Sequence, residues 1–183
     1  MKTLILTGLS LLFLSATPVS TVFKTFKSSV EFRSEAPLEL IQADSKKLVG
    51  LLDTEKKSYA FQVAVISFQG FNSELQREHF NENYMESTKY PKIKFVGKIQ
   101  DAIDFKGSFE KQVELKGNLT LHGITKERTI KAVIKKVGDK VTATSTFEVK
   151  LLDHNIKIPT IVNQKLAKVI MVNVNTEMLP KVK

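Results

Sequence analysis

Apolar residues at every second position recur in six segments of this chain, and this alternation restricts its fold more than any other feature. In residues 92–99 (KIKFVGKI), Ile93, Phe95 and Ile99 share one side and the lysines share the other. Successive side chains of a strand point to opposite faces, so this pattern predicts strands with one buried and one wet face. The other five segments are residues 59–68, 113–122, 128–136, 141–151 and 169–176, and weaker strands are expected at 29–32, 47–52 and 103–109.

Short turns separate several of these segments. Gly123 follows one alternating run, and Val137-Gly138-Asp139 precedes another. Connections this short join antiparallel neighbours. Eight or nine strands in one domain of a 183-residue chain need closure, because an open sheet would expose an apolar face and bare edges. We therefore predict an all-β, closed antiparallel barrel of about eight strands, with an interior that is either filled by side chains or open for one small ligand.

The stretch SELQREHFNENY interrupts the alternation and predicts a short helix. Ser73 is a suitable N-cap with Gln76 three residues later, and Leu75 and Phe80 are expected to face inward. Pro91 prevents the helix from continuing into the next strand. The helix, or a capped loop, would cover part of one barrel end.

A second interruption, PTIVNQKLAKV, predicts one turn or more of helix beginning at Pro159. Ile161, Leu166 and Val169 are expected to be buried there. The expected fold therefore includes one or two short helices.

The first 22 residues have the composition of a secretory signal peptide. One lysine precedes an apolar run from Leu4 to Leu14, which small residues and a proline follow. This run is shorter than the roughly 20 residues of a membrane span. We predict cleavage between residues 16 and 22, a single barrel domain over residues 23–183, and a periplasmic or secreted protein. The chain has no cysteine, so neither a disulfide nor a lipid-modified cysteine contributes.

The positive charge of the chain is concentrated in its second half. Residues 92–183 carry eighteen Lys/Arg against nine Asp/Glu, whereas residues 23–91 carry nine against ten. Nucleic acid is not the expected partner, because only three arginines are present and phosphate and guanine recognition favours arginine. Anionic lipid head groups, through peripheral contact with a membrane surface, or a pyrophosphate fit this charge better than nucleic acid does, and lysines that simply solvate the outer face of a sheet are the alternative.

No recognisable catalytic or metal-binding motif is present. A zincin-type site would need a histidine four residues after His79, where Asn83 stands. His122 is expected to stabilise a turn by hydrogen bonding, and His154 lies beside other turn-like residues. The crowded stretch around His79 fits better as a clasp on the barrel rim, where Phe80 and Tyr84 reach inward and polar side chains hold the backbone. We predict no metal, no cofactor and no enzymatic activity.

Three stretches, HFNENYMESTKYPKIKFVGKI, KGNLTLHGITKERTI and FEVKLLDHNIKIP, occur in an order that resembles the YceI-like family of exported proteins. The resemblance extends from about Leu48 to the end of the chain. Within the family, the sequence is most similar to a shorter branch common in Bacteroidetes-type bacteria. It implies a lipocalin-like barrel that carries a long apolar molecule, notably a polyisoprenoid. Gln76-Arg77-Glu78-His79-Phe80 and Leu152-Asp153-His154-Asn155 depart from the arginine-aspartate motifs of better-known members, so the fold carries over better than the cargo.

The sequence therefore leaves three hypotheses for the function. The first is a binding protein with an apolar ligand inside the barrel, the second a filled barrel that serves as a structural or protein-interaction module of the envelope, and the third an enzyme that uses His79, His122 or His154. The sequence carries no signal for an oligomeric state. For the first function, the residues expected to line the ligand are Phe61, Val63, Val65, Phe68, Phe80, Tyr84, Ile93, Phe95, Leu119, Leu121 and Phe147.

Overall fold

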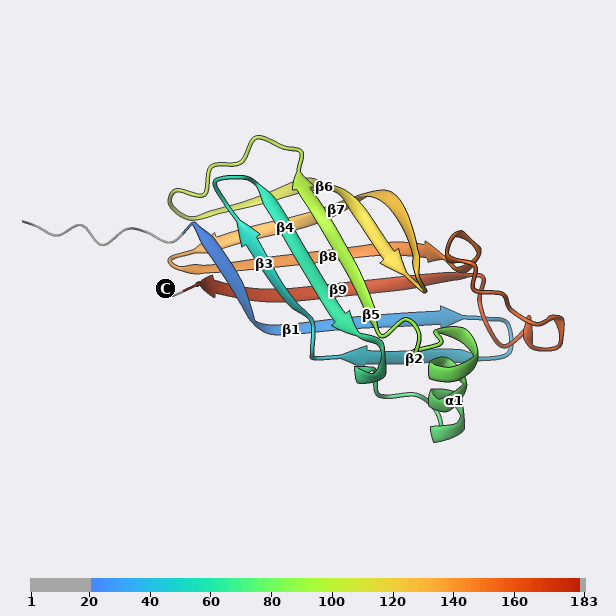
Figure 1. Ribbon diagram of the computed structural model, residues 1–183. Coiled ribbons are helices and arrows are strands. Elements are labelled where there is room, and N and C mark those ends of the chain that lie inside the picture. Colours follow the sequence, from blue (N-terminus) through green and yellow to red (C-terminus); the bar gives the residue numbers. More distant parts are fainter. Residues whose placement is uncertain (1–20, 182–183) are drawn as a thin grey trace, which may run out of the picture.

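The computed structural model describes residues 21–181, and its strands form one antiparallel sheet that closes on itself (Figure 1). The sheet order is β2-β1-β3-β4-β5-β6-β7-β8-β9, and β1 also pairs with β9. Eight strands therefore close the barrel, with β2 as an additional strand, and the predicted fold class is confirmed. The strands are β1 (Val22–Glu35), β2 (Leu40–Ser45), β3 (Val49–Asp53), β4 (Ser58–Ala64), β5 (Lys92–Ile99), β6 (Phe109–Leu121), β7 (Ile124–Val137), β8 (Lys140–Lys150) and β9 (Val169–Pro180).

Strand β1 is longer than predicted and has two partners along one edge. Its first residues, 22–24, pair with β3, and its last, 30–35, pair with β2. A register shift between Thr25 and Lys27 in the pairing with β9 marks a bulge. The bulge breaks the alternation, which explains why only residues 29–32 were predicted to form a strand. Strand β2 was not predicted at all, because Ala43 and Ser45 on its buried face are small.

The barrel end at which β1 begins and β9 ends is filled by side chains. Phe23, Tyr59, Val113, Val141 and Met178 pack there with other buried residues. Residues 100–108 form a loop beside this end, so the strand predicted at 103–109 is wrong (Figure 1).

This loop is held without strand pairing. The Asp101 carboxylate accepts the Glu114 N–H at 2.6 Å, and Lys111 Nζ donates to the Ala102 carbonyl at 2.6 Å. These local bonds replace the ladder that the alternating residues suggested.

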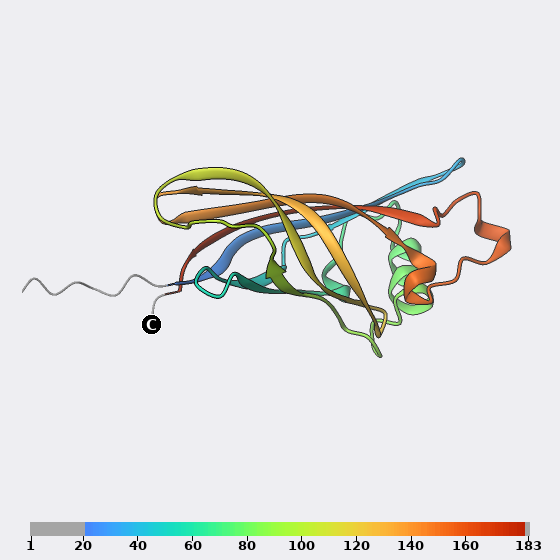
Figure 2. The same ribbon diagram turned by 90° about the horizontal axis from the view of Figure 1, so that it is seen from above.

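The opposite end carries the helical segments. Helix α1 (Glu74–His79) begins after Ser73, whose hydroxyl accepts the Gln76 N–H at 3.2 Å, and continues into the π-helical turn η2 (Phe80–Tyr84). The predicted helix and its cap are confirmed, but Leu75 is 58% exposed and does not face inward. Figure 2 shows α1 beside this end of the barrel.

The second predicted helix is reduced to one 3-10 turn, η4 (Thr160–Val162). Ile161 is 92% exposed and Val169 is also exposed, so both burial predictions are wrong, whereas Leu166 is partly buried. Two further 3-10 turns are η1 (Val65–Ser67), where the strand predicted to run to residue 68 ends, and η3 (Leu151–His154). Between residues 21 and 181, no helix combines the length and the apolar character that crossing a bilayer requires.

Strands β7 and β8 separate toward the helical end of the barrel. Their ladder runs only from Val137 with Lys140 to Val133 with Thr144, although both strands continue (Figure 1). Side chains bridge the widening gap: the Ser145 hydroxyl donates to the Lys131 carbonyl at 2.7 Å, and Arg128 donates to the Glu148 carbonyl at 2.7 Å. Turn η3 packs beside β7 at the wide end of this gap. The wall of the barrel is therefore completed here by side chains and not by a strand ladder.

Candidate ligand-binding cavity

The helical half of the barrel encloses a cavity of about 380 Å³, within the size range of small-molecule sites. Its wall is mainly apolar and comes from strands of the barrel, from α1 with η2, and from residues 151–166. Ten of the eleven residues predicted to line a ligand site lie on this wall: Phe61, Val63, Phe68, Phe80, Tyr84, Ile93, Phe95, Leu119, Leu121 and Phe147. Their contact with a ligand stays a prediction.

Val65 is the exception among the predicted residues. It opens turn η1 instead of continuing β4, and it is 1% exposed. Its side chain packs in the cluster that contains Met85, Leu119 and Leu121, and it is not part of the cavity wall. The loss of alternation after Ala64 moves it out of line with Phe61 and Val63.

The cavity has a floor. Phe61, Phe95, Leu115 and Ala143 line the cavity and also pack against the filled core at the other end of the barrel. The interior is therefore a blind pocket and not a tunnel through the barrel.

Tyr59 lies in the filled core below this floor. Its ring is 5.1 Å from the ring of Phe95. Its hydroxyl is buried next to Gly97 and Gly117 and has no hydrogen-bond partner among residues 21–181. Burial raises the pKa of Tyr59, and it also raises the pKa of Tyr84 on the cavity wall. Both hydroxyls are therefore neutral at physiological pH.

Four phenylalanines form a continuous aromatic wall beside η2. Phe80 stacks on Phe32 with a centroid distance of 5.3 Å, and it lies 5.1 Å from Phe71 and 5.9 Å from Phe68. Such ring pairs add to the stability that burial alone provides. Neither Phe32 nor Phe71 was predicted as a site residue. Phe32 is the last residue of the weak strand predicted at 29–32, and Phe71 falls in an irregular loop.

Polar side chains mark the mouth of the cavity. Lys165 and His79 line it and are exposed, and Glu39 and Gln76 line it and are partly buried. Gln76 Nε2 donates to Glu39 Oε1 at 2.7 Å, which joins α1 to the β1–β2 turn. The Leu38 N–H donates to the Gln164 carbonyl at 2.9 Å and joins that turn to the loop after η3. Three segments far apart in sequence therefore surround one opening.

His122 holds the rim of the barrel, as the sequence predicted. It forms the two-residue turn between β6 and β7 together with Gly123, and both residues have positive φ values. Its Nε2 lies 2.6 Å from Glu86 Oε2, and its Nδ1 donates to the His154 carbonyl at 3.0 Å. One side chain thus joins the β6–β7 turn, the end of η2 and turn η3.

The three histidines do not form a common site. His79 is at the cavity mouth, whereas His122 and His154 are in the rim contact described above. No group of three or more potential metal ligands occurs among the side chains of residues 21–181.

His154 gives the fold a pH dependence that can be measured. It is fully buried, and Nδ1 donates to the Ile124 carbonyl at 3.1 Å. Burial lowers the pKa of His154, an effect that carbonyls of Ile124 and Leu121 and the Asp153 carboxylate oppose only in part. The unfolded chain has the ordinary histidine pKa of about 6.5. The contribution of neutral His154 to stability is therefore complete above pH 6.5 or so and is lost as the pH falls toward the folded-state pKa.

We expect the urea concentration at the unfolding midpoint of the wild type to decrease when the pH is lowered from 7.5 to 5.5. The decrease should be smaller in His154→Gln. Urea unfolding at both pH values for the two proteins measures the difference and cancels the contribution of other titrating groups. The same pH dependence in wild type and variant would contradict the account of His154.

Comparison with known proteins agrees with this geometry. The YceI-like domain family matches residues 10–178, a range that starts inside the predicted signal peptide. A UPF0312 protein of Pseudomonas putida strain W619 is 27% identical over 118 residues, which cover 61% of this chain and 59% of the relative. A counterpart from strain GB-1 is 26% identical over the same coverage. The chain therefore spans 59% of the length of these relatives.

Solved structures share the fold at low sequence identity. A polyisoprenoid binding domain from Saccharophagus degradans, implicated in plant cell wall breakdown, superposes with a TM-score of 0.75 at 12% identity, over 90% of this chain and 100% of the other. Burkholderia cenocepacia BcnA gives 0.69 at 17% identity over 82% and 95% of the two chains. The YCEI protein of Campylobacter jejuni gives 0.57 at 18% identity over 100% of both. At such identities the structures speak for the fold alone, whereas the family match covers most of the sequence. The chain belongs to the YceI-like domain family.

Proposed function

We propose that this protein is an exported carrier that holds a long apolar molecule, such as a polyisoprenoid, inside its barrel. The observation that carries the proposal is the blind cavity of about 380 Å³, with an apolar wall and a polar mouth. Each buried CH2 group contributes about 0.8 kcal/mol, so an apolar chain needs few polar contacts for tight binding. The name of the Saccharophagus domain supports the same ligand class.

The cavity also favours this proposal over the two alternatives. A barrel that serves only as a structural module would have its interior filled along its whole length, whereas here only the end at which β1 begins and β9 ends is filled. An enzyme would need convergent reactive groups. His122 is engaged by Glu86 and by a backbone carbonyl, and His154 by Ile124.

Export is part of the proposal and rests on the sequence of residues 1–22, most of which lie outside the described region. The first described residue adds one constraint. The Thr21 carbonyl accepts hydrogen bonds from the backbone N–H of Thr54 at 2.8 Å and from its hydroxyl at 3.0 Å. A mature chain that keeps these contacts begins at or before Thr21, which argues only against cleavage after Thr21, at the end of the predicted window.

A single tryptophan can test ligand binding directly, because the natural chain contains none. In Phe71→Trp the indole would lie on the cavity wall near the mouth. We expect a polyprenol to shift its emission to shorter wavelength, with saturation at micromolar concentration or below. Phe26→Trp is the matched control, because Phe26 is exposed at the β1 bulge and should not respond. A response of equal size in both variants, or in neither, would reject the carrier function.

A further inference from the structure

The loop between η3 and β9 combines two roles at the cavity mouth. Its inner side chains Ile156, Val162 and Leu166 line the cavity. It projects beyond the strands at the helical end of the barrel, as Figures 1 and 2 show. It is tied to the rest of the molecule by the Ala167 N–H, which donates to the Ser34 hydroxyl at 2.9 Å. Any surface that contacts this loop therefore lies directly at the opening.

The outer side of the same loop is apolar at its tip. Ile161 is 92% exposed, which is the largest value among the exposed large apolar residues of the described region. Leu38 is 65% exposed on the adjacent β1–β2 turn, where its N–H bonds to the Gln164 carbonyl, and Leu40 follows at 46%. Large apolar side chains in such positions mark contact surfaces when they gather in one place.

The charges around these apolar residues are positive. Residues 155–168 contain Lys157, Lys165 and Lys168 and no carboxylate. None of these lysines has an ion-pair partner among residues 21–181. Of the two carboxylates on the β1–β2 turn, Glu35 pairs with Arg33 at 3.1 Å, whereas Glu39 accepts from the neutral Gln76 amide and keeps its charge.

The helix on the other side of the mouth has a different character. Glu78 and Glu82 are exposed there and have no ion-pair partner in the described part of the chain. They would repel an anionic surface. The helix side is therefore left out of the contact, which includes only the loop and the β1–β2 turn.

We propose that Leu38, Leu40, Lys157, Ile161, Lys165 and Lys168 form a rim that docks on an anionic lipid bilayer. The apolar tips would enter the boundary between head groups and acyl chains, and the lysines would lie among the anionic head groups. Docked in this way, the cavity mouth faces the lipid, so an apolar chain can pass between bilayer and barrel without crossing water. This last step rests on the carrier function, whereas docking itself does not.

Vesicle flotation of the purified protein tests the proposal. We expect the wild type to float with phosphatidylcholine vesicles that contain phosphatidylglycerol, and to float much less with phosphatidylcholine alone. Each lysine near an anionic surface strengthens binding about fivefold. Lys157→Glu with Lys165→Glu should therefore weaken binding by more than about tenfold, and raised salt should act in the same direction. Ile161→Asp should weaken binding to a similar degree.

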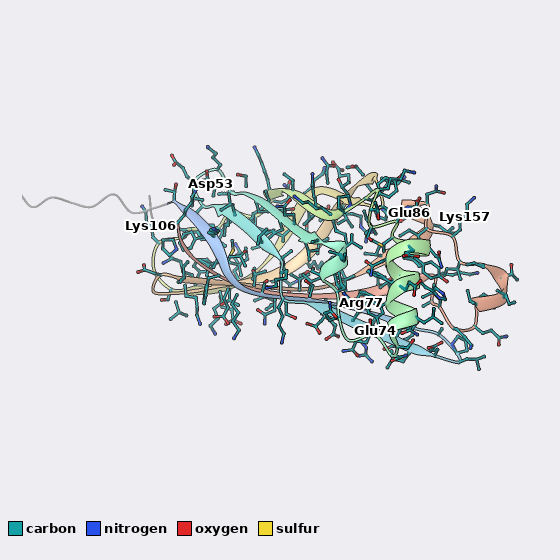
Figure 3. The ribbon with its side chains drawn as sticks, turned by 60° about the horizontal axis from the view of Figure 1, so that its bottom comes forward. Asp53, Glu74, Arg77, Glu86, Lys106 and Lys157 are labelled. Carbon is teal, nitrogen blue, oxygen red and sulfur yellow. The ribbon has the colours of Figure 1, made fainter. Side chains whose placement is uncertain are left out.

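Matched controls lie at the opposite end of the barrel. Figure 3 places Lys106 at that end, far from Lys157, and Val137 is 55% exposed on the β7–β8 turn. Lys106→Glu and Val137→Asp should leave flotation unchanged. Equal losses from both sets of variants would show a nonspecific charge effect and overturn the proposal, as would the absence of flotation. A mass doubling that Ile161→Asp abolishes would also overturn it, because a second copy would then cover the rim.

The test separates docking from cargo binding. Flotation needs no ligand in the cavity. If the protein floats but the Phe71→Trp emission does not respond to a polyprenol, docking is supported and the carrier function is rejected. If the Phe71→Trp emission responds but the protein does not float, the carrier function is supported and docking is rejected.

Discussion

Ala143→Phe is expected to weaken binding of a long polyprenol by more than about 100-fold and to weaken binding of a short one much less. Ala143 is on the cavity floor, and a phenylalanine there would occupy the deepest part of the pocket. Displacing one five-carbon isoprene unit removes about 4 kcal/mol of burial at 0.8 kcal/mol for each carbon group, part of which the ligand recovers elsewhere. Titration with polyprenols of increasing length measures the effect.

The control for this variant is the same substitution on the outer face. Ala60→Phe adds an equal side chain at an exposed position of β4. It should leave affinity at every chain length unchanged. Urea unfolding of both variants shows whether Ala143→Phe remains folded, since extra volume in a packed region costs about 1–3 kcal/mol. Unchanged polyprenol affinity in a folded Ala143→Phe protein would show that the cavity floor is not part of the binding site.

Gly117→Ala is expected to cause a large loss of stability, because the added methyl group has no space between β5 and β6. Gly117 pairs directly with Gly97 on the neighbouring strand. A Cβ at residue 117 would lie 2.5 Å from the Val96 carbonyl oxygen, 2.7 Å from the Tyr59 hydroxyl and 2.9 Å from Gly97 Cα. Two of these three neighbours are backbone atoms that cannot turn away. We expect a decrease of about 3 kcal/mol or more in the free energy of unfolding, at the upper end of the overpacking range.

Gly107→Ala separates this clash from the general effect of replacing glycine. Nothing lies within 4 Å of a Cβ at residue 107, but its φ of +70° is unfavourable for alanine. That conformation alone costs about 1–2 kcal/mol. Denaturant unfolding should therefore give a clearly lower free energy of unfolding for Gly117→Ala than for Gly107→Ala. The reverse order would show that β5 and β6 can separate enough to accept a methyl group.

The sequence predicted the barrel well because its signal is local and repeated. Alternation in β5 identified Ile93, Phe95 and Ile99 as inward-facing, and all three are more buried than the lysines between them. The short turn at His122 and Gly123 gave the pairing of β6 with β7. Closure followed because a sheet of this size leaves no other way to remove its edges.

Position along the barrel could not be predicted from the same signal. Val113 and Leu119 both point inward from β6, but Val113 packs in the filled end and Leu119 lines the cavity. A period of two distinguishes inside from outside and carries no information about which inward residues meet empty space. The division between core and cavity depends on how far opposite strands separate, which is a property of the whole barrel.

The mouth was missed for a related reason. Glu39 and Lys165 come from irregular segments that lie far apart in the sequence, and only the closed barrel brings them to one opening. Ile161 was expected to be buried as part of a helix that begins at Pro159, but only a single 3-10 turn forms there. In the structure its neighbour Val162 faces the cavity and Ile161 faces solvent.

Native mass spectrometry of the protein purified from an exporting host, followed by solvent extraction, tests the central claim most directly. The carrier account predicts a discrete adduct that extraction identifies as an apolar lipid, and it predicts that Ala143→Phe carries a shorter chain or none. A bare protein mass that does not change after incubation with polyprenols would contradict it.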